Sequence, residues 1–274
     1  MNRFVRQPAV AGRFYPGKAD ELLQSLREYL EPANQPHTKP IGIVVPHAGY
    51  MYSGHVAGAV YARIDLPQRN IVLCPNHTGL GTPLSIMTAG AWRTPLGDMQ
   101  IDEEMCTGLM TEDSALAEDI SAHRFEHAVE VQIPFMQHIG GASIRFVPIT
   151  VGTNDFKQLV ELGHAISEVV REIAPEALII ASSDMNHYES DAVTRVKDRK
   201  AIDQVLAMDP RGLYDVVRNE NISMCGYGPT VAMLTAAKIL GATRAELVKY
   251  ATSGEVSLDF DRVVGYAGII VDAV

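Results

Sequence analysis

The stretch IGIVVPHAGY, Ile41 to Tyr50, decides the fold prediction because it joins a buried strand to a polar loop. Its first five residues are apolar without interruption and rich in β-branched side chains, which is typical of a strand covered on both faces. Pro46 and His47 follow at once, so the strand ends by presenting an imidazole. In open α/β sheets, ligands bind at the carboxyl ends of the strands. The stretch therefore predicts an α/β fold with a functional site beside His47.

Strand and helix patterns alternate along the rest of the chain. NIVLCPN and ALIIASSD repeat the buried-strand pattern, and DFKQLVELGHAISEVVREI has the apolar spacing of an amphipathic helix. PLSIMTAGAWRTPLGDMQID is typical of a β-hairpin or a similar excursion, and we expect a polar loop around His123 to Pro134. We expect three more strands at SIRFVPITVG, ELVKYATS and VVGYAGIIV, and helices near Ala19–Glu31, Gly54–Ile64, Asp102–Asp113, Val193–Met208, Pro210–Asn219 and Thr230–Leu240. Without repeats or a Pro/Ser-rich linker, the sequence predicts one α/β domain over residues 1–274, with a mixed, mostly parallel central sheet flanked by helices.

Composition excludes several classes of function. A hydrophobic share of 47% and a charged share of 20% are typical of a soluble globular protein. A net charge of −10 without a basic stripe argues against nucleic-acid binding. No apolar run approaches the roughly 20 residues that span a bilayer. No signal-peptide pattern opens the chain, so we expect a cytoplasmic protein with no membrane partner. Its three cysteines are an odd number without a CxxC pair, which argues against a disulfide framework.

Three predicted strands end in polar residues of similar character. His47 follows the first, His77 in CPNHTG follows the second, and Asp184 and His187 in SSDMNH follow the third. Imidazoles suit Fe, Cu and Zn, and rigid strands fix the geometry of metal ligands. The sequence therefore predicts a metal bound by His47 and His77. Spacing leaves the third ligand open among four candidates: Asp184, His187, Glu130 and Cys225.

Cys225 stands out among the cysteines because it precedes a helix predicted to start near Pro229. Its neighbours Gly226 and Gly228 let the backbone approach a ligand closely, and a helix N-terminus favours a thiolate. We interpret Cys225 as a metal ligand or a reactive thiol. The other two, Cys74 and Cys106, fall in apolar patterns and are expected to be buried.

Two carboxylate–histidine pairs share a spacing of three residues. His127 and Glu130 in HRFEHAVEVQIPF lie one helical turn apart, so both can face a single pocket. Asp184 and His187 have the same spacing, and a carboxylate beside an imidazole raises its basicity. These four residues are the candidates for proton transfer. The other histidines, His37, His55, His123, His138 and His164, have weaker contexts and receive no role.

The assembled motifs resemble the Memo family. They are PAVAGRFYPG, PHAGYMYSG, CPNHTG, RTPLGD, EHAVEVQIPF, SSDMNHY and MCGYGP, in the order of the family and across almost the whole chain. Memo proteins are similar in fold to the class III, LigB-type extradiol dioxygenases, so the resemblance implies a single α/β domain of that type. One departure from the animal Memo proteins is Thr78, where they tend to carry a second consecutive histidine.

The resemblance also implies a metal pocket of two histidines and one cysteine, which map onto His47, His77 and Cys225. It implies that the four proton-transfer candidates, Asp184, His187, His127 and Glu130, line the same cleft. In the dioxygenases the metal is Fe(II), held by two histidines and a carboxylate. By this resemblance we expect Fe(II) first. The cysteine at the third position makes Cu or Zn alternatives and puts ring cleavage in doubt. Bacterial and archaeal family genes often lie near a radical S-adenosylmethionine protein gene, which implies a shared pathway.

Three functions compete on these observations. The leading hypothesis is a metal-dependent, dioxygenase-like oxidoreductase acting on a small molecule. A non-catalytic module that binds a ligand or short peptide in the same cleft is the second, although a phosphate-reading pocket needs arginines and the motifs offer only Arg93 and Arg124. Hydrolysis by a zinc-activated water is the third.

Overall fold

The computed structural model describes residues 4–30 and 37–273, whose strands form one mixed sheet. Its strands are β1 (Val5–Arg6), β2 (Gly42–Val45), β3 (Arg69–Pro75), β4 (Leu84–Ile86), β5 (Ala91–Thr94), β6 (Gly97–Ile101), β7 (Ala117–Glu118), β8 (Arg145–Val151), β9 (Leu178–Ser182), β10 (His187–Glu189), β11 (Arg244–Thr252) and β12 (Val263–Asp272). The main path through the sheet is β1-β5-β6-β8-β3-β9-β2-β12-β10. β4 joins it beside β8 and carries β7, and β11 pairs with β12.

The centre of the sheet is parallel and its flanks contain antiparallel pairs. β8, β3, β9 and β2 run parallel to one another, whereas β5 and β6 form an antiparallel hairpin and β12 is antiparallel to β2. Every residue of β2 and β9 is buried, as expected for strands covered on both faces. The predicted fold class, a mixed and mostly parallel sheet flanked by helices, is confirmed.

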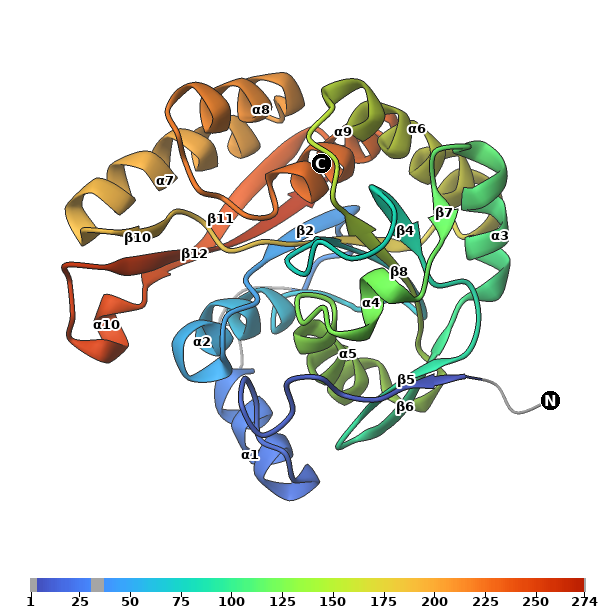
Figure 1. Ribbon diagram of the computed structural model, residues 1–274, viewed down its shortest axis with the longest axis horizontal. Helices are drawn as coiled ribbons and strands as arrows, with labels where there is room; N and C mark the ends of the chain where they lie inside the picture. The colour runs from blue at the N-terminus through green and yellow to red at the C-terminus, as the bar shows by residue number, and fades with distance from the viewer. Residues whose placement is uncertain (1–3, 31–36, 274) are drawn as a thin grey trace.

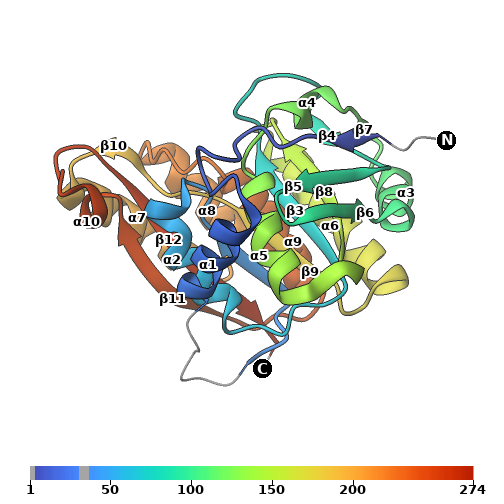
Figure 2. The same ribbon diagram turned by 90° about the horizontal axis from the view of Figure 1, so that it is seen from below.

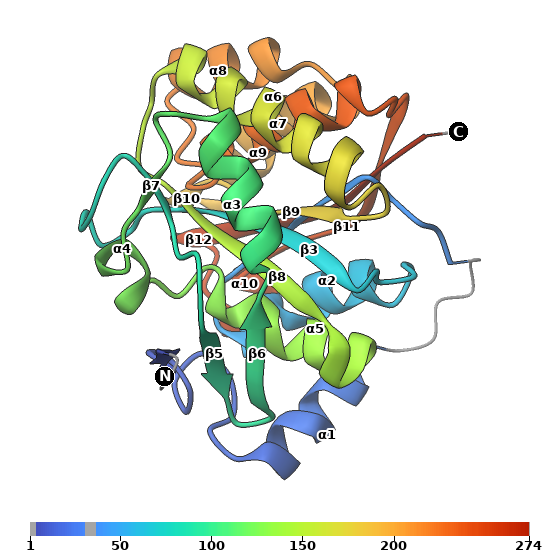
Figure 3. The same cartoon turned by 90° about the vertical axis from the view of Figure 1, so that its right-hand side faces the viewer.

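Helices cover both faces of the sheet. They are α1 (Ala19–Tyr29), α2 (Tyr50–Tyr61), α3 (Glu103–Glu112), α4 (Ser121–Arg124), α5 (Ile133–Gly140), α6 (Phe156–Ile173), α7 (Asp191–Leu206), α8 (Pro210–Asn219), α9 (Tyr227–Ile239) and α10 (Gly254–Ser257), with short 3-10 turns η1 (Glu130–Gln132) and η2 (Gly141–Ser143). Figure 3 shows α6, α7, α8 and α9 on one face and α1, α2 and α5 on the other, and Figures 1 and 2 agree. Among the described residues, no helix has the length and apolarity needed to cross a membrane.

Burial explains the different sequence patterns of the helices. α6 buries one apolar face that includes Leu159, Ile166 and Val170, and the Asp155 side chain caps its N-terminus by accepting from the Lys157 amide. α9 lies between the sheet and the neighbouring helices α6 and α8, and every residue from 228 to 237 is buried. It is therefore apolar around most of its circumference.

The structure corrects three details of the predicted elements. α9 starts at Tyr227, earlier than expected, because a proline in the first turn removes an N–H that has no intrahelical partner. The predicted hairpin is shorter, since only β5 and β6 form it while β4 pairs with β8. The segment predicted as a polar loop from His123 to Pro134 contains the end of α4, η1 and the start of α5.

Candidate metal centre

The ends of β2, β9 and β3 bring the predicted site residues together. His47, Asp184 and His77 each lie two residues beyond the end of their strand. The strands with the two histidines are not neighbours, because β9 lies between them and pairs with both. The three loops therefore leave the same edge of the sheet side by side, with Asp184 in the middle.

Hydrogen bonds fix the tautomer of His47. The Ser182 hydroxyl donates its single proton to the Ala128 carbonyl (2.7 Å) and accepts from the Gln132 amide (2.9 Å). It therefore accepts from His47 Nδ1, 3.0 Å away, which leaves a lone pair on Nε2. Burial, followed by the charge of His77, holds the pKa of His47 well below its usual value, so the ring is neutral and available as a ligand.

Cys225 lies against this free nitrogen. Its Sγ is 3.2 Å from His47 Nε2 and accepts the Asp184 backbone N–H at 3.3 Å. Burial raises the pKa of the thiol, so without a cation nearby it keeps its proton. Gly226 makes this placement possible, because a Cβ there would come within 2.5 Å of the Ser182 carbonyl oxygen. From the sequence, Gly226 was expected to let the backbone approach a ligand closely. In the structure, Gly226 instead lets the backbone approach the end of β9 closely.

Asp184 supports the loop that carries His47. Its Oδ1 accepts the backbone N–H groups of His47 (2.8 Å) and Ala48 (3.3 Å). The residue is 5% exposed, and burial raises the pKa of its carboxyl group. Asp184 thus belongs to the base of the cleft, and its contacts are those of a group that orders the backbone.

Glu126 holds His77 and was missed by the sequence interpretation. Its carboxylate accepts His77 Nδ1–H at 2.9 Å and the His77 backbone N–H at 2.7 Å, so His77 Nε2 is also left with a lone pair. Burial alone would raise the pKa of Glu126, but the hydrogen bond and charge of His77 lower it to about 2. Burial lowers the pKa of His77, yet the Glu126 contact outweighs it and the net direction is upward.

His127 joins the two histidine ligands in a cluster of rings. Its ring centroid is 4.7 Å from that of His77 and 5.4 Å from that of His47, and Phe14 packs against it at 4.8 Å. Burial, followed by the charge of His47, lowers the pKa of His127 to about 4. His127 thus lies beside both histidines, and its ring is neutral near pH 7.

Glu130 lies away from the histidines, contrary to the expected pairing with His127. The segment between them is not a regular helix, so the spacing of three residues does not place both on one face. The Glu130 carboxylate is fully buried and binds Arg6 and the Tyr15 hydroxyl (2.7 Å), together with two backbone N–H groups. Glu126, four residues earlier in the same motif, is the carboxylate that contacts the histidine cluster.

His187 lies at the rim of the cleft on β10. Its Nδ1 donates to the Ser223 carbonyl at 2.9 Å, and its backbone N–H donates to the Ser223 hydroxyl at 2.7 Å. Its Nε2 therefore also carries the lone pair. The ring is near enough for its charge to lower the pKa of His47, although no hydrogen bond joins the two rings in the described part of the chain.

The donor set fits a metal ion. One ligand atom each of His47, His77 and Cys225 lies within 4.8 Å of the other two. Tetrahedral sites have metal–nitrogen distances of about 2.0 Å and metal–sulfur distances of about 2.3 Å, which place donors about 3.5 Å apart. The separation of 3.2 Å between Sγ and Nε2 is close to that spacing. The histidines already present Nε2 lone pairs, so small movements suffice.

A second group of potential ligands, His77, Glu126 and His127, is less suitable. Glu126 Oε1 already accepts from His77 Nδ1 and from the backbone N–H groups of His127 (2.8 Å) and Ala128 (3.0 Å). A metal would have to displace these hydrogen bonds from a fully buried carboxylate. Glu126 is therefore better suited to orienting His77 than to binding a metal.

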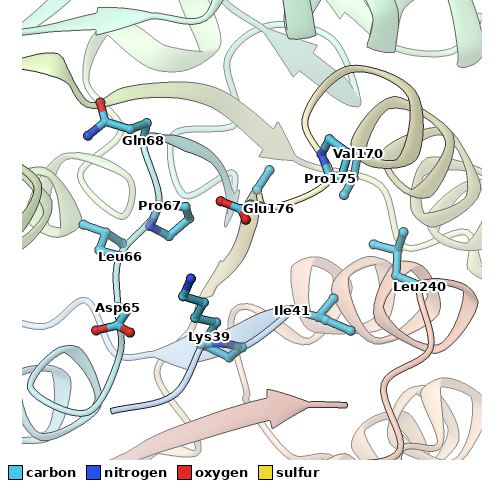
Figure 4. A pocket seen from close by; sticks show the side chains of 12 residues that line it. Lys39, Ile41, Asp65, Leu66, Pro67, Gln68, Val170, Pro175, Glu176 and Leu240 are labelled. Carbon is cyan, nitrogen blue, oxygen red and sulfur yellow. The ribbon is translucent and has the colours of Figure 1, made fainter.

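A separate cavity of about 580 Å³ lies at the opposite edge of the sheet. Figure 4 shows Lys39, Glu176 and Gln68 around it, beside the amino ends of β2, β9 and β3. It contains none of the predicted site residues. The histidine cluster at the carboxyl ends remains the candidate site.

Fold and site together define an α/β protein with a His/His/Cys cluster that could hold a metal ion at the carboxyl edge of a mixed sheet. A family model described as "Memo-like protein" matches residues 6–270, so the chain belongs to the Memo-like family.

Relatives along the full length agree with this assignment. A MEMO1 family protein of Methanopyrus kandleri is 44% identical over 97% of this chain and 98% of its own length. A MEMO1 family protein of Methanosarcina mazei is 44% identical over 98% of this chain and 99% of its own length. A MEMO1 family protein of Methanocaldococcus jannaschii is 43% identical over 99% of this chain and 100% of its own length. An uncharacterized Escherichia coli K12 protein shares the fold at 11% identity, with a TM-score of 0.57 over 84% of this chain and 98% of that one.

Proposed function

We propose that this chain is a metal-dependent redox enzyme that binds Fe(II), or alternatively copper, through His47, His77 and Cys225. The observation that carries the proposal is the convergence of two Nε2 lone pairs and one thiol, each oriented by its own hydrogen-bond partner. Oriented imidazoles with a fixed tautomer are characteristic of metal ligands. A thiolate beside imidazoles suits iron, copper and zinc.

The chain's own residues supply proton transfer around this centre. The chemistry that iron or copper supplies when bound is a change of redox state beside an open coordination position. His127 is neutral near pH 7 because burial lowers its pKa to about 4, so it can accept hydrogen bonds from a substrate in the cleft. His187 presents a free Nε2 from the rim, where it can accept or return a proton. Glu126 and Asp184 keep His77 and His47 in position.

A peptide-binding module receives less support from the cleft. Recognition of a phosphate requires free guanidinium groups. Of the two arginines that the motifs offer, Arg93 pairs with Asp98 at 2.7 Å, and Arg124 is exposed beside residues 4–9, in a pocket that contains none of the three proposed ligands. The substrate class therefore stays a small molecule in this proposal, and the pathway link to a radical S-adenosylmethionine protein stays a prediction.

Metal content per chain tests the proposal. The untagged protein is purified without oxygen beside H47A, C225A and the control H164A, which removes an exposed histidine of α6. We expect one iron or copper per wild-type and H164A chain and loss of the metal from the other two variants. Full metal retention in H47A would show that the ligand assignment is wrong.

The identity of the metal separates the remaining functions. Exclusive uptake of zinc would favour a metal-activated water and hydrolysis, because zinc has no redox chemistry. No uptake of Fe(II), Cu(I) or Zn(II) by the wild type would refute the enzyme proposal and favour a binding module.

A further inference from the structure

Arg6 is a buried cation that lies outside the metal cluster. It is 1% exposed and its guanidinium stacks over Trp92, with 4.2 Å between the central carbon and the ring centroid. All three of its nitrogens reach residues 123–130. Nε donates to the His123 carbonyl at 3.1 Å, Nη2 donates to the Glu126 carbonyl at 2.6 Å, and Nη1 binds the Glu130 carboxylate. One side chain thus holds this segment near its start, middle and end.

Glu130 ties the N-terminal segment to the same place. The carboxylate accepts from Arg6 and from three further donors of that segment: the Ala9 N–H, the Val10 N–H and the Tyr15 hydroxyl. These contacts bring residue 14 to the cleft, where the Phe14 ring packs on His127. The motifs PAVAGRFYPG and EHAVEVQIPF are therefore joined through Glu130, which also pairs with Arg6, two residues before the first motif.

Glu126 transmits this arrangement to the site. Its carbonyl accepts from Arg6, while its carboxylate holds both the ring and the backbone of His77. A displacement of the backbone at residue 126 would move the acceptor that fixes the His77 tautomer. We propose that Arg6 is a positioning residue of the metal centre, acting through Glu126 on His77, an inference that rests on the proposed function.

The substitution Arg6→Lys separates the effect of the positive charge at residue 6 from the effect of its hydrogen-bond geometry. A lysine keeps the positive charge beside the buried Glu130 carboxylate, but its single ammonium cannot reproduce the planar fork that serves three acceptors. The matched control is Arg69→Lys. Arg69 also binds a buried carboxylate, because two of its nitrogens donate to Asp102 at 2.6 Å each. It lies at the start of β3, however, whereas His77 follows the end of that strand.

The first measurement is zinc affinity of the purified apoprotein, with unfolding by denaturant followed in parallel. We expect Arg6→Lys to weaken zinc binding about 10- to 100-fold, the usual effect of losing an outer partner of a metal ligand. Arg69→Lys should bind zinc like the wild type even where its unfolding midpoint falls by a similar amount. Wild-type affinity in Arg6→Lys, or equal losses in both variants, would overturn the proposal.

A double-mutant cycle tests the route through Glu126. If Arg6 acts through that residue, adding Arg6→Lys to Glu126→Gln should cause little further loss of zinc affinity. Full additivity of the two losses would overturn the route. Where Arg6→Lys does not fold, the neutral pair Arg6→Met with Glu130→Gln replaces it, because it leaves no unpaired buried charge.

A readout without metal distinguishes failure of this inference from failure of the proposed function. Nitrogen-15 NMR of the His77 ring in the apoprotein at high pH reports which nitrogen carries the proton. We expect Nδ1–H in the wild type and in Arg69→Lys, and a mixture of both neutral tautomers in Arg6→Lys. If the wild type took up no metal, the proposed function would fail, while an unchanged His77 tautomer in Arg6→Lys would overturn the positioning role itself.

Discussion

Replacing Asp198 by asparagine should stabilise the protein at high pH. Asp198 is fully buried on α7, where its carboxylate accepts the Asn186 backbone N–H (2.8 Å) and the Tyr250 hydroxyl (2.7 Å). Burial raises its pKa from 3.8 to about 7, although these hydrogen bonds and the charge of Arg195 act in the other direction. Glu189 adds a smaller repulsion that raises the pKa further.

The sign of the effect follows from proton uptake. Between pH 4 and 7 the folded protein keeps a proton on Asp198 that the unfolded chain has lost, so the free energy of unfolding falls as pH rises. Each pH unit in that window is worth about 1.4 kcal/mol. From about pH 5 to about pH 8, one unit above the folded pKa near 7, the loss is about 2 to 3 kcal/mol and nearly complete.

Denaturant unfolding of the wild type and of D198N at about pH 5 and about pH 8 measures the free energy of unfolding that is lost when Asp198 ionises. Asparagine cannot ionise, so D198N should gain about 2 to 3 kcal/mol relative to the wild type between the two conditions. Comparing the two pH values cancels the pH-independent effect of altered hydrogen bonds to Tyr250. A difference that does not change with pH would refute the reasoning.

Two further predictions concern the site and the core. Ser182→Ala removes the hydroxyl that accepts from His47 Nδ1, so it should weaken metal binding about tenfold in a titration. An unchanged metal affinity would contradict the argument that Ser182 fixes the His47 tautomer. Gly58→Ala would place a Cβ 2.3 Å from the Tyr29 carbonyl oxygen. The substitution should therefore lower the free energy of unfolding by about 1 to 3 kcal/mol in denaturant unfolding. An unchanged free energy of unfolding would show that α1 can move away from α2.

The sequence predicted the strand-end part of the site and missed the parts that depend on long-range contacts. His47, His77 and Asp184 could be foreseen because each follows a buried parallel strand, and such strands end at one edge of the sheet. Cys225 was one of four candidates for the third ligand, and the family resemblance selected it, since nothing in its spacing shows that Gly226 packs on β9.

Glu126 and Arg6 could not be derived from local patterns. Helical spacing favoured Glu130 over Glu126, but the chain is irregular between residues 125 and 129, so that periodicity does not apply. Arg6 contacts Glu130 across a separation of 124 residues, and the acceptors of its other donors are backbone carbonyls. Carbonyl acceptors have no signature in the sequence, because every residue carries one.

Electrostatics act differently on the three residues of the cluster. Burial lowers the pKa of His47, so protons do not compete for this imidazole near pH 7, whereas the Glu126 contact raises the pKa of His77, where a proton does compete with a metal. Burial also raises the pKa of Cys225, and the charge of Asp184 raises it further, so the thiol keeps its proton. A divalent metal between the three donors reverses that balance, since a coordinated thiol loses its proton. A metal held by these three residues would therefore set the charge of the Cys225 sulfur, whereas near pH 7 the thiol without a metal keeps its proton.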